Sequence, residues 1–550
     1  MIRKLLVSLT LLFYFNSSAQ NTLGTTFITE DVFEAFTLYT VNTKSYLLNN
    51  CGEVINEWTS AYLPGNAVYL LPNGNLLRAG RLADGSSDIS LGGQGGIIEL
   101  YNWDGDLLWS YVYNTNTFRQ HHDVFPMPNG NVLILAVKTI TDTEAIDEGR
   151  NPALLADTRL YMEEIFEVEP VGTNQANVVW EWNIKDHLIQ DFDNTKANFG
   201  DVSANPGKMD INFLNGGSGG ENWLHFNSIQ YYENFDQIVI SSRNLSEVLI
   251  IDHSTTTAEA ATSSGGNSGR GGDFVYRWGN PQSYQQGTAT DRILYGQHYP
   301  HYIADGLTDE GKIILFNNGN GREPNFSEVL IIDPPVSDTG IYSYTPDTAY
   351  GPLAADYTYS DLPADPTADS DFYSAIVSSA QRLPNGNTLI CEGRTGEIFE
   401  IDASDTIVWE YQNPISNADG TSYIQGEAPP VNGLVFRAIK YAPDYPAFVG
   451  RDLTPGAPLE QNPDLTACFN LSVDDFEITE ISIHPNPATD YINVTSTSNI
   501  DKIELYSVLG KKVHEVNDVD TMNLSNFNSG IYFVRLYSGN NSISKKIIKQ

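Results

Sequence analysis

The sequence predicts an all-β protein, a six-bladed β-propeller followed by a small β-sandwich. Three observations lead to this fold class. A strand, a Pro-Asn-Gly turn and a second strand recur along most of the chain. Apolar residues show no sustained helical periodicity. The charge balance changes near the end of the chain, which is typical of a second domain.

The recurring phrase predicts a set of β-hairpins. It reads LLPNGNLLRAG at 70–80, PMPNGNVLILAV at 126–137 and RLPNGNTLICEG at 382–393. Each copy is followed by a second hairpin with an aromatic strand, and two degenerate copies lie between the second and the third. A four-stranded antiparallel unit that repeats in this way is typical of a propeller blade. We therefore expect five units between Asn66 and Pro414.

A sixth unit is predicted to be split between the two ends of this region. Ser45–Trp58 would supply its outer hairpin, and Val435–Phe448 would supply inner strands. Joining both ends in one blade closes the ring and leaves no exposed sheet edge. An open sandwich of similar strands is the alternative, which the repeated hairpins disfavour.

The composition excludes several classes of function. The 550 residues contain 69 Asp and Glu against 30 Lys and Arg, a formal net charge of −39. Such a chain repels phosphate backbones, so we expect neither nucleic-acid binding nor adhesion to anionic membranes. No apolar stretch after residue 20 is long enough to span a bilayer.

The start of the chain predicts export. Residues 1–19 combine a basic beginning, an apolar run and small residues, as in a secretory signal peptide; a short buried helix or an uncleaved anchor is the alternative. Disulfides form outside the cytoplasm, and the chain has three cysteines. We expect Cys51 to pair with Cys468, because both flank the region where the ring would close. Cys391 lies in an apolar strand and is expected to be a buried thiol.

Residues 20–470 are assigned to the propeller and residues 471–550 to a second domain. From residue 478 onward the chain carries seven basic and seven acidic side chains, so the excess negative charge lies upstream. Short alternating strands in this tail are typical of a small β-sandwich.

The tail also carries recognisable motifs, HPNPATDYINV at 484–494, IELYSVLGKKV at 503–513 and LSNFNSGIYFVRL at 524–536. They resemble the C-terminal sorting domain of the type IX secretion system of Bacteroidetes. The resemblance implies export through the periplasm, with the type IX secretion machinery as a partner, to a secreted or cell-surface location. A surface-binding module kept in the mature protein is the alternative.

Polar side chains that suit chemistry lie where several of the repeated units begin. His225 and His298 occupy matching places before their hairpins, His122 lies level with Asn227, and Arg243 ends the second strand of the His225 unit. The first strand of each blade lines the channel of a propeller, so we expect these side chains to meet there. A slip of one residue would exchange His122 with His121.

This set predicts an anion site. Strand alternation places Asn227 on the same face as His225, so that its amide and the imidazoles would bind oxygens beside the Arg243 fork. Three histidines also suggest zinc, but no HxH or HExxH spacing occurs and a guanidinium disfavours a cation, so we expect no metal and no cofactor. The alternative is that the histidines are structural and bond to neighbouring strands.

Seven segments together resemble the bacterial arylsulfate sulfotransferases that do not use a nucleotide sulfate donor. They are HHDVFPMPNGNVLIL (121–135), VVWEWNIKDHLIQD (178–191), NWLHFNSI (222–229), ISSRNLSEVLIIDHST (240–255), FVYRWGNP (274–281), GQHYPHYI (296–303) and LICEGRTGEIFEI (389–401). The resemblance implies a six-bladed propeller with a central active site. It also implies that His298 is transiently sulfated, that His122, His225 and Arg243 are catalytic, and that Asn227 binds substrate.

The function predicted in this way is ping-pong transfer of a sulfuryl group from an aryl sulfate donor to a phenol acceptor through a sulfohistidine. A noncatalytic cell-surface propeller that binds sulfated or acidic ligands is the alternative. A metal-dependent sulfatase is a further alternative, but the chain lacks the Cys/Ser-x-Pro-x-Arg signature of that family.

Overall fold

The chain forms two compact units, Met1–Leu465 and Thr466–Gln550. The structure, a computed structural model, describes residues 21–469 and 482–550 except 84, 86, 218, 364, 366, 497–499, 508–511, 518–519 and 539–540. The predicted signal peptide at 1–19 and the predicted boundary at 470/471 lie outside the described residues.

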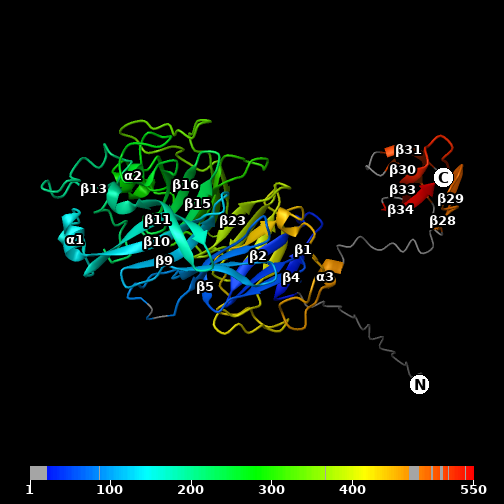
Figure 1. The fold of residues 1–550 in the computed structure, drawn as a ribbon, viewed down its shortest axis with the longest axis horizontal. Helices are drawn as coiled ribbons and strands as arrows, with labels where there is room; N and C mark the ends of the chain where they lie inside the picture. The colour runs from blue at the N-terminus through cyan, green and yellow to red at the C-terminus, as the bar shows by residue number, and fades with distance from the viewer. Residues whose placement is uncertain are drawn as a thin grey trace, which may run out of the picture. The chain divides into compact units, whose positions relative to one another are not determined.

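Within the described part of the first unit, six antiparallel sheets of four or five strands account for most of the chain (Figure 1). The first two are β5 (Leu63–Leu70), β6 (Leu76–Arg81), β7 (Gly96–Tyr101) and β8 (Leu107–Val112), then β9 (Phe118–Pro126), β10 (Val132–Thr141), β11 (Arg159–Val171) and β12 (Gln175–Asn183). The next two are β15 (Phe226–Tyr232), β16 (Gln237–Ser242), β17 (Glu247–Asp252) and β18 (Tyr276–Trp278), then β19 (His298–Tyr302), β20 (Ile313–Asn317), β21 (Glu328–Ile332) and β22 (Tyr357–Tyr359). The all-β prediction is therefore confirmed.

The last two sheets join the beginning of the first unit to its end. One has β27 (Ile439–Tyr441), β2 (Phe36–Val41), β3 (Lys44–Leu48) and β4 (Val54–Thr59) in spatial order, so both ends of the region meet in one sheet as expected. Val435–Phe448 supplies one strand rather than the inner strands predicted, and β2 lies outside the two predicted segments. The other has β23 (Ser379–Arg382), β24 (Thr388–Glu392), β25 (Glu397–Ile401) and β26 (Ile407–Gln412), and β1 (Gly24–Ile28) adds a fifth strand against β26. The sequence did not predict this fifth strand. In Figure 1 the blue β2 accordingly lies beside yellow strands from late in the chain.

Short elements connect the sheets. Helices α1 (Asp142–Asp147), α2 (Thr257–Ala260) and α3 (Thr466–Phe469) are one or two turns long, and β13 (Leu188–Ile189) pairs in parallel with β14 (Met209–Asp210). Single 3₁₀ turns occur at Pro152–Leu154, Ile184–His187, Pro281–Tyr284, Ala289–Asp291 and Pro446–Phe448. In the part of the chain that the structure describes, no helix has the length and apolar character needed to cross a membrane.

The Pro-Asn-Gly phrases form the turns that the sequence predicted. Gly74, Gly130 and Gly386 have φ values of 84°, 88° and 91°, a backbone region that favours glycine over residues with a Cβ. Apolar side chains fill the spaces between neighbouring sheets, so that a strand such as β16 is buried along its whole length. This packing explains why the central strands are apolar on both faces.

Side chains and backbone of the first strands bond to one another between successive sheets. The contacts are Tyr69 Oη to Asp123, Ile229 N to Asp123, Asn227 Nδ2 to Gln297 O, Val377 N to His298, Lys440 N to Gln381, and Leu70 N to Tyr441 Oη. These contacts join neighbouring sheets within their first strands or just before them.

The second unit holds two antiparallel sheets in its described residues. They are β28 (Ser482–His484), β29 (Tyr491–Thr495) and β32 (Thr521–Asn523), and β30 (Lys502–Ser507), β31 (Lys512–Asn517), β33 (Gly530–Ser538) and β34 (Asn541–Lys549). Ile492 and Met522 of one sheet share a small core with Ile503 and Val534 of the other. Cys51 and Cys468 are each disulfide-bonded and Cys391 is a buried free thiol, in agreement with the prediction.

Candidate functional site

Three of the predicted histidines lie together, His122 in the middle of β9, His225 just before β15 and His298 at the start of β19. The ring centroids of His122 and His225 are 4.8 Å apart. The ring of Phe436 is 6.3 Å from that of His122 and 6.4 Å from that of His298, so it lies beside both. Burial lowers the pKa of His122 well below its usual value, and the neighbouring His225, His121, His298 and Arg243 lower it further. The site therefore holds neutral imidazoles.

The backbone at this site breaks the regular alternation on which the sequence prediction relied. His122 and His225 both have a φ of 50°, in the left-handed region. The pairing of β9 with β10 and of β15 with β16 shifts register beside these residues. A bulge of this kind redirects a side chain, so counting by twos does not decide which way each histidine faces.

The tautomer of His298 is determined by Asn318. The Nδ2 atom of Asn318 donates hydrogen bonds to the carbonyl oxygens of Ser374, at 2.7 Å, and Val377, at 2.8 Å, which orients its amide. Its Oδ1 atom must then accept from His298 Nδ1, 2.7 Å away. His298 Nε2 consequently carries a lone pair, which accepts a hydrogen bond from Val377 N at 3.2 Å. Burial, and then the nearby Arg243, lower the pKa of His298 to about 3.

A buried chain of hydrogen bonds runs from Glu163 to His122. Glu163 Oε1 accepts from the backbone N–H of Phe226 at 2.9 Å, and Oε2 lies 3.0 Å from His121 Nε2. His121 Nδ1 lies 2.8 Å from His122 Nδ1. When His121 donates to the carboxylate, its Nδ1 accepts from His122, and His122 Nε2 is left as a proton acceptor. The question of which histidine of the pair faces the site is thereby answered: His122 contacts His225, and His121 contacts Glu163.

His225 has the opposite tautomer. Asn222 Nδ2 donates to His225 Nδ1 at 2.8 Å, so the proton of the neutral ring is on Nε2. A Cβ at Gly92 would lie 3.0 Å from the His225 ring, and one at Gly93 would lie 2.3 Å from the His122 ring. This glycine pair lets the backbone pack directly on both imidazoles, and any side chain there would displace them.

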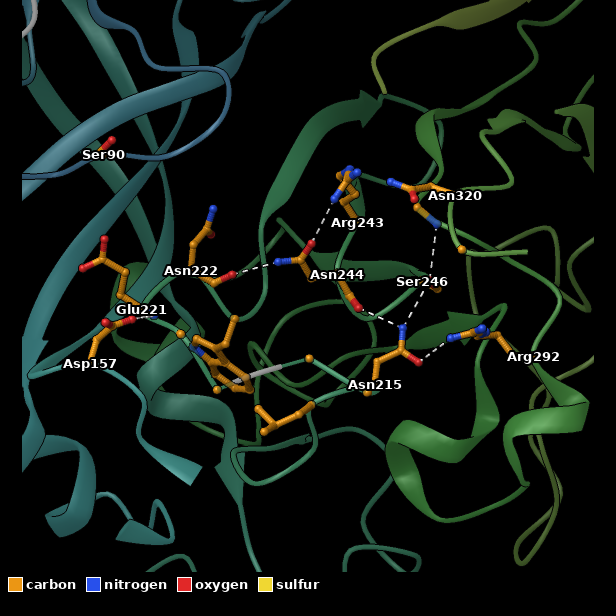
Figure 2. Close-up of a pocket in the computed structure, with 18 residues that line it drawn as sticks. Ser90, Asp157, Asn215, Glu221, Asn222, Arg243, Asn244, Ser246, Arg292 and Asn320 are labelled. Atoms are coloured by element: carbon orange, nitrogen blue, oxygen red, sulfur yellow. Dashed lines mark hydrogen bonds between the residues drawn. The ribbon is translucent and has the colours of Figure 1, made fainter. Parts of the chain in front are cut away.

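A cavity of about 670 Å³ is lined by Asn222, Arg243 and Gly296, among other residues (Figure 2). Asn222 and Arg243 bond to His225, and Gly296 lies two residues before His298, but none of the three histidines is among the lining residues. Arg243 directly follows β16, and its backbone N–H donates to the carbonyl of His225 at 3.1 Å. Its Nη1 donates to Asn244 Oδ1 at 3.2 Å. Burial lowers the pKa of Arg243, but a guanidinium keeps its charge in a protein.

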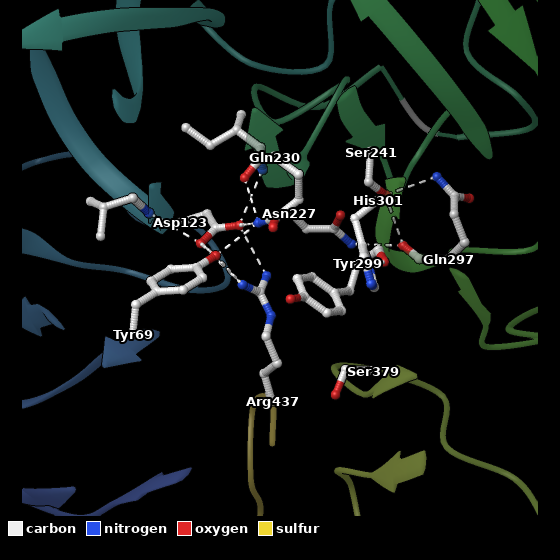
Figure 3. Close-up of polar contacts among 12 residues, drawn as sticks. Tyr69, Asp123, Asn227, Gln230, Ser241, Gln297, Tyr299, His301, Ser379 and Arg437 are labelled. Carbon is white, nitrogen blue, oxygen red and sulfur yellow. Dashed lines mark hydrogen bonds and ion pairs between the residues drawn. The ribbon is translucent and has the colours of Figure 1, made fainter. Parts of the chain in front are cut away.

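Asn227 lies behind the histidines rather than in the lining of this cavity. Its Nδ2 donates to the carbonyl oxygen of Gln297 at 2.8 Å, and Ser241 Oγ donates to the same oxygen at 3.1 Å (Figure 3). Its Oδ1 is buried, with no hydrogen-bond partner in the described structure. The structure thus places Asn227 where it holds the backbone just before His298, and its binding of substrate stays a prediction.

A second polar network lies under the histidines, and the sequence did not predict it. Arg437 forms an ion pair with Asp123, with 2.9 Å between Nη2 and Oδ2, and its guanidinium stacks 3.8 Å from the ring centroid of Tyr299 (Figure 3). Asp123 also accepts from the backbone of Ile229 and from Tyr69 Oη. The signals available in the sequence were the Asp of the HHD motif and the lone Arg of VFRAIK.

The other described histidines of the first unit have different environments. His187 bonds to Asp273, and His253 bonds to Asp236 and Glu167, which raise the pKa of His253 to about 9 against the opposing effect of burial. Among the described residues, no cluster of His, Cys, Asp and Glu has the geometry of a metal site. Asn318 and Glu163, which the sequence prediction missed, lie in the stretches LFNNGN and MEEIFEV, and neither stretch carries a motif that marks it.

Two family models match the chain. One, described as arylsulfotransferase (ASST), matches residues 65–423, and the other, a secretion system C-terminal sorting domain, matches residues 482–550. The resemblances inferred from the motifs are therefore confirmed. No curated protein matches the chain.

Several solved structures are similar to this chain, at low sequence identity. A protein of unknown function from Bacteroides caccae is 10% identical, with 74% of this chain and 98% of that chain covered and a TM-score of 0.38. Virginiamycin B lyase from Staphylococcus aureus is 12% identical, with 65% and 73% covered and a TM-score of 0.29. The β-propeller domain of Cps50 (Swd1) from Myceliophteria thermophila is 11% identical, with 72% and 88% covered and a TM-score of 0.31.

Proposed function

The chain belongs to the arylsulfotransferase family, and from this premise we propose that it transfers a sulfuryl group from an aryl sulfate to a phenol through a sulfated His298. One observation carries the proposal. His298 is a buried neutral imidazole with its proton held on Nδ1 by Asn318, so that Nε2 carries the lone pair, and Arg243 is near enough to lower the pKa of the ring. The hydrogen bond that Val377 N–H donates to Nε2 at 3.2 Å must break before Nε2 can attack. A neutral imidazole nitrogen is a nucleophile, and the Arg243 charge attracts the sulfate.

In the first half-reaction, His298 Nε2 attacks the sulfur of the donor in line with the bond to the aryl oxygen. The N–S bond forms, the S–O bond breaks, and its electron pair leaves on the phenolate. Sulfuryl transfer resembles phosphoryl transfer, in which charge spreads over three equatorial oxygens in a loose transition state. We assign Arg243 and the Nε2–H of His225 as the donors that stabilise those oxygens.

In the second half-reaction, the oxygen of an acceptor phenol attacks the sulfur and His298 Nε2 leaves with its electron pair. The acceptor must lose its proton, and phenols have a pKa of about 10 in water. His122 Nε2 takes this proton, and the His121–Glu163 pair stabilises the charge that forms on His122. The proton is returned to a departing phenolate or to water.

The scaffold that we propose for this site is a closed six-bladed propeller over residues 20–470. The support is that the first strands of the six sheets bond to one another in order and that β27 bonds to β5 at the end of the series. A ring brings side chains from distant repeats to one axis, which explains why three of the sheets each supply one histidine.

The sorting domain marks the chain for export, and its location is secreted or cell-surface, as predicted. We further propose that residues 1–19 are a signal peptide and that residues 471–550 are the domain recognised by the type IX secretion machinery. Small aryl sulfates and phenols outside the cell would then be the substrates.

The test is sulfuryl transfer from 4-nitrophenyl sulfate to phenol by the purified protein. We expect release of 4-nitrophenol that depends on phenol, and loss of that release by at least about 10³-fold in His298→Ala, since the covalent route is removed. Labelling of the wild-type protein by the donor alone, at a histidine that is absent in the variant, supports the intermediate. Binding of the donor without turnover would instead favour a noncatalytic propeller.

A further inference from the structure

The cavity lined by Arg243 contains a second guanidinium that the proposed reaction does not use. Arg292 lines the cavity together with Arg243 (Figure 2). Its Nη1 donates to Asn215 Oδ1 at 2.8 Å, and its guanidinium lies 4.2 Å from the ring centroid of Tyr295. Within residues 21–469 as described, no carboxylate forms an ion pair with Arg292 or Arg243.

An unpaired guanidinium in this chain needs an explanation, because acidic residues outnumber basic ones 69 to 30. The neighbouring Arg322 provides a direct comparison. It contacts the same Tyr295 ring, at 5.4 Å, but it is paired with Glu328 at 2.7 Å and does not line the cavity. Arg292 and Arg322 both contact the Tyr295 ring, but only Arg292, which lines the cavity, forms no ion pair with a carboxylate in the described structure.

Hydrogen bonds hold the Arg292 side chain in place in the cavity wall. Asn215 Nδ2 donates to the carbonyl of Asn244 at 2.8 Å, which directs Asn215 Oδ1 toward Arg292. Asn244 in turn accepts from Arg243. The two guanidiniums are therefore held by one continuous chain of amides, visible across Figure 2. Such preorganised cations bind oxyanions without the cost of ordering flexible side chains.

The acidic residues in the lining do not cancel this pair. Glu221 is bound to Arg159 at 2.5 Å, and Asp157 accepts from the backbone N–H of Glu221 at 2.9 Å. Both lie across the view in Figure 2 from Arg292. The wall that carries Arg243 and Arg292 is thus the side of the cavity that favours an anion.

The in-line geometry of sulfuryl transfer indicates which part of the substrate lies against this wall of the cavity. The leaving phenolate and the incoming phenol both occupy the position opposite His298 Nε2, so donor and acceptor use one aryl subsite. A cavity of about 670 Å³ is large enough for a substituted arene. We propose that Arg292 binds a second anionic substituent, such as a carboxylate, on the ring of the aryl substrate. This inference rests on the proposed function and makes anionic phenols the preferred acceptors.

The test compares two acceptors of nearly equal shape, 4-hydroxyphenylacetate and its neutral amide 4-hydroxyphenylacetamide, with 4-nitrophenyl sulfate as donor. We expect the wild-type protein to prefer the carboxylate by about tenfold in kcat/KM, a value typical of one charge-assisted hydrogen bond. In Arg292→Gln the preference should disappear, while turnover of the amide is retained and reports that the variant is folded. Arg322→Gln is the matched control and should keep the preference.

Equal use of both acceptors by the wild-type protein, or a preference that survives in Arg292→Gln, would overturn the inference and leave the proposed function intact. If the wild-type protein transfers no sulfuryl group to either acceptor, the proposed function fails instead. Calorimetric binding of the same two compounds then decides the inference alone: tighter binding of the carboxylate that is lost in Arg292→Gln supports the subsite, and equal binding refutes it.

Discussion

Replacing Asn318 by aspartate should make the activity sensitive to acid. In the native protein the amide oxygen of Asn318 accepts from His298 Nδ1, and no charge is present on that side of the ring. A carboxylate in the same place stabilises the imidazolium form, and an opposite charge at this distance raises a pKa by about one to three units. The pKa of His298 should rise from about 3 to between about 4 and 6.

The sign follows from the protonation state of the nucleophile. Only neutral His298 can attack sulfur, so activity falls as the pH drops through the pKa of this ring. At pH 5 the native ring is about 99% neutral with a pKa of about 3. A pKa of about 6 would leave roughly one tenth of the rings neutral at that pH, so the variant should lose about tenfold in rate between pH 8 and pH 5.

Asn318→Leu is the matched control for this experiment. Both variants lose the hydrogen bonds from Asn318 Nδ2 to the carbonyls of Ser374 and Val377, at a cost of about 1–3 kcal/mol for each buried acceptor left unpaired. Only Asn318→Asp introduces charge. The leucine variant should therefore be slower at every pH, because His298 Nδ1 has no acceptor, without a shift of its acid limb.

The assay is kcat/KM for 4-nitrophenyl sulfate with excess phenol between pH 4 and pH 9, with chemical denaturation at each end of the range to show that both variants stay folded. An acid limb in Asn318→Asp that coincides with the native one would refute the reasoning. It would mean that Asn318 does not control the protonation of the nucleophile.

Two further predictions test the residues around His298. Glu163→Gln removes the carboxylate that supports proton acceptance by His122, so transfer to phenol should slow by about 10²-fold, and transfer to more acidic phenols should slow less. A rate loss that is the same for all acceptors would indicate a purely structural role for Glu163. Arg437→Met leaves the buried Asp123 without its cation and should lower the free energy of unfolding by about 3–5 kcal/mol, measured by urea denaturation. A change below about 1 kcal/mol would contradict the view that this ion pair holds the strands together.

The repeated hairpins could be predicted from sequence because their signals are local. Each Pro-Asn-Gly phrase needs only a glycine with positive φ and apolar strands on both sides, and all three form the turns expected. The joining of both ends in one sheet could be predicted too, but its second strand, Phe36–Val41, was not among the predicted segments. The strand Gly24–Ile28 was missed, because its pairing with β26 joins two distant segments and has no repeat to mark it.

In the candidate site too, some features could be predicted from local sequence and others could not. The residue types at His122, His225, His298 and Arg243 were readable from their places in the repeats, and the structure brings them together. The direction of each histidine was not readable. The left-handed backbone at His122 and His225 interrupts the alternation of side chains along the strands, so that alternation does not predict which way these two histidines point.

By itself the sequence determined the repeated hairpins, the all-β class and the identity of the polar side chains, because turn chemistry and hydrophobic period act over a few neighbouring residues. The tertiary structure alone decided the tautomer of each histidine. The tautomers depend on Asn318 and Glu163, which accept hydrogen bonds from His298 and His121, and on Asn222, which donates one to His225. Asn318 and Glu163 lie far along the chain from those rings. A proton's place on an imidazole depends on which donors and acceptors lie nearest in space, and no spacing in the chain encodes it.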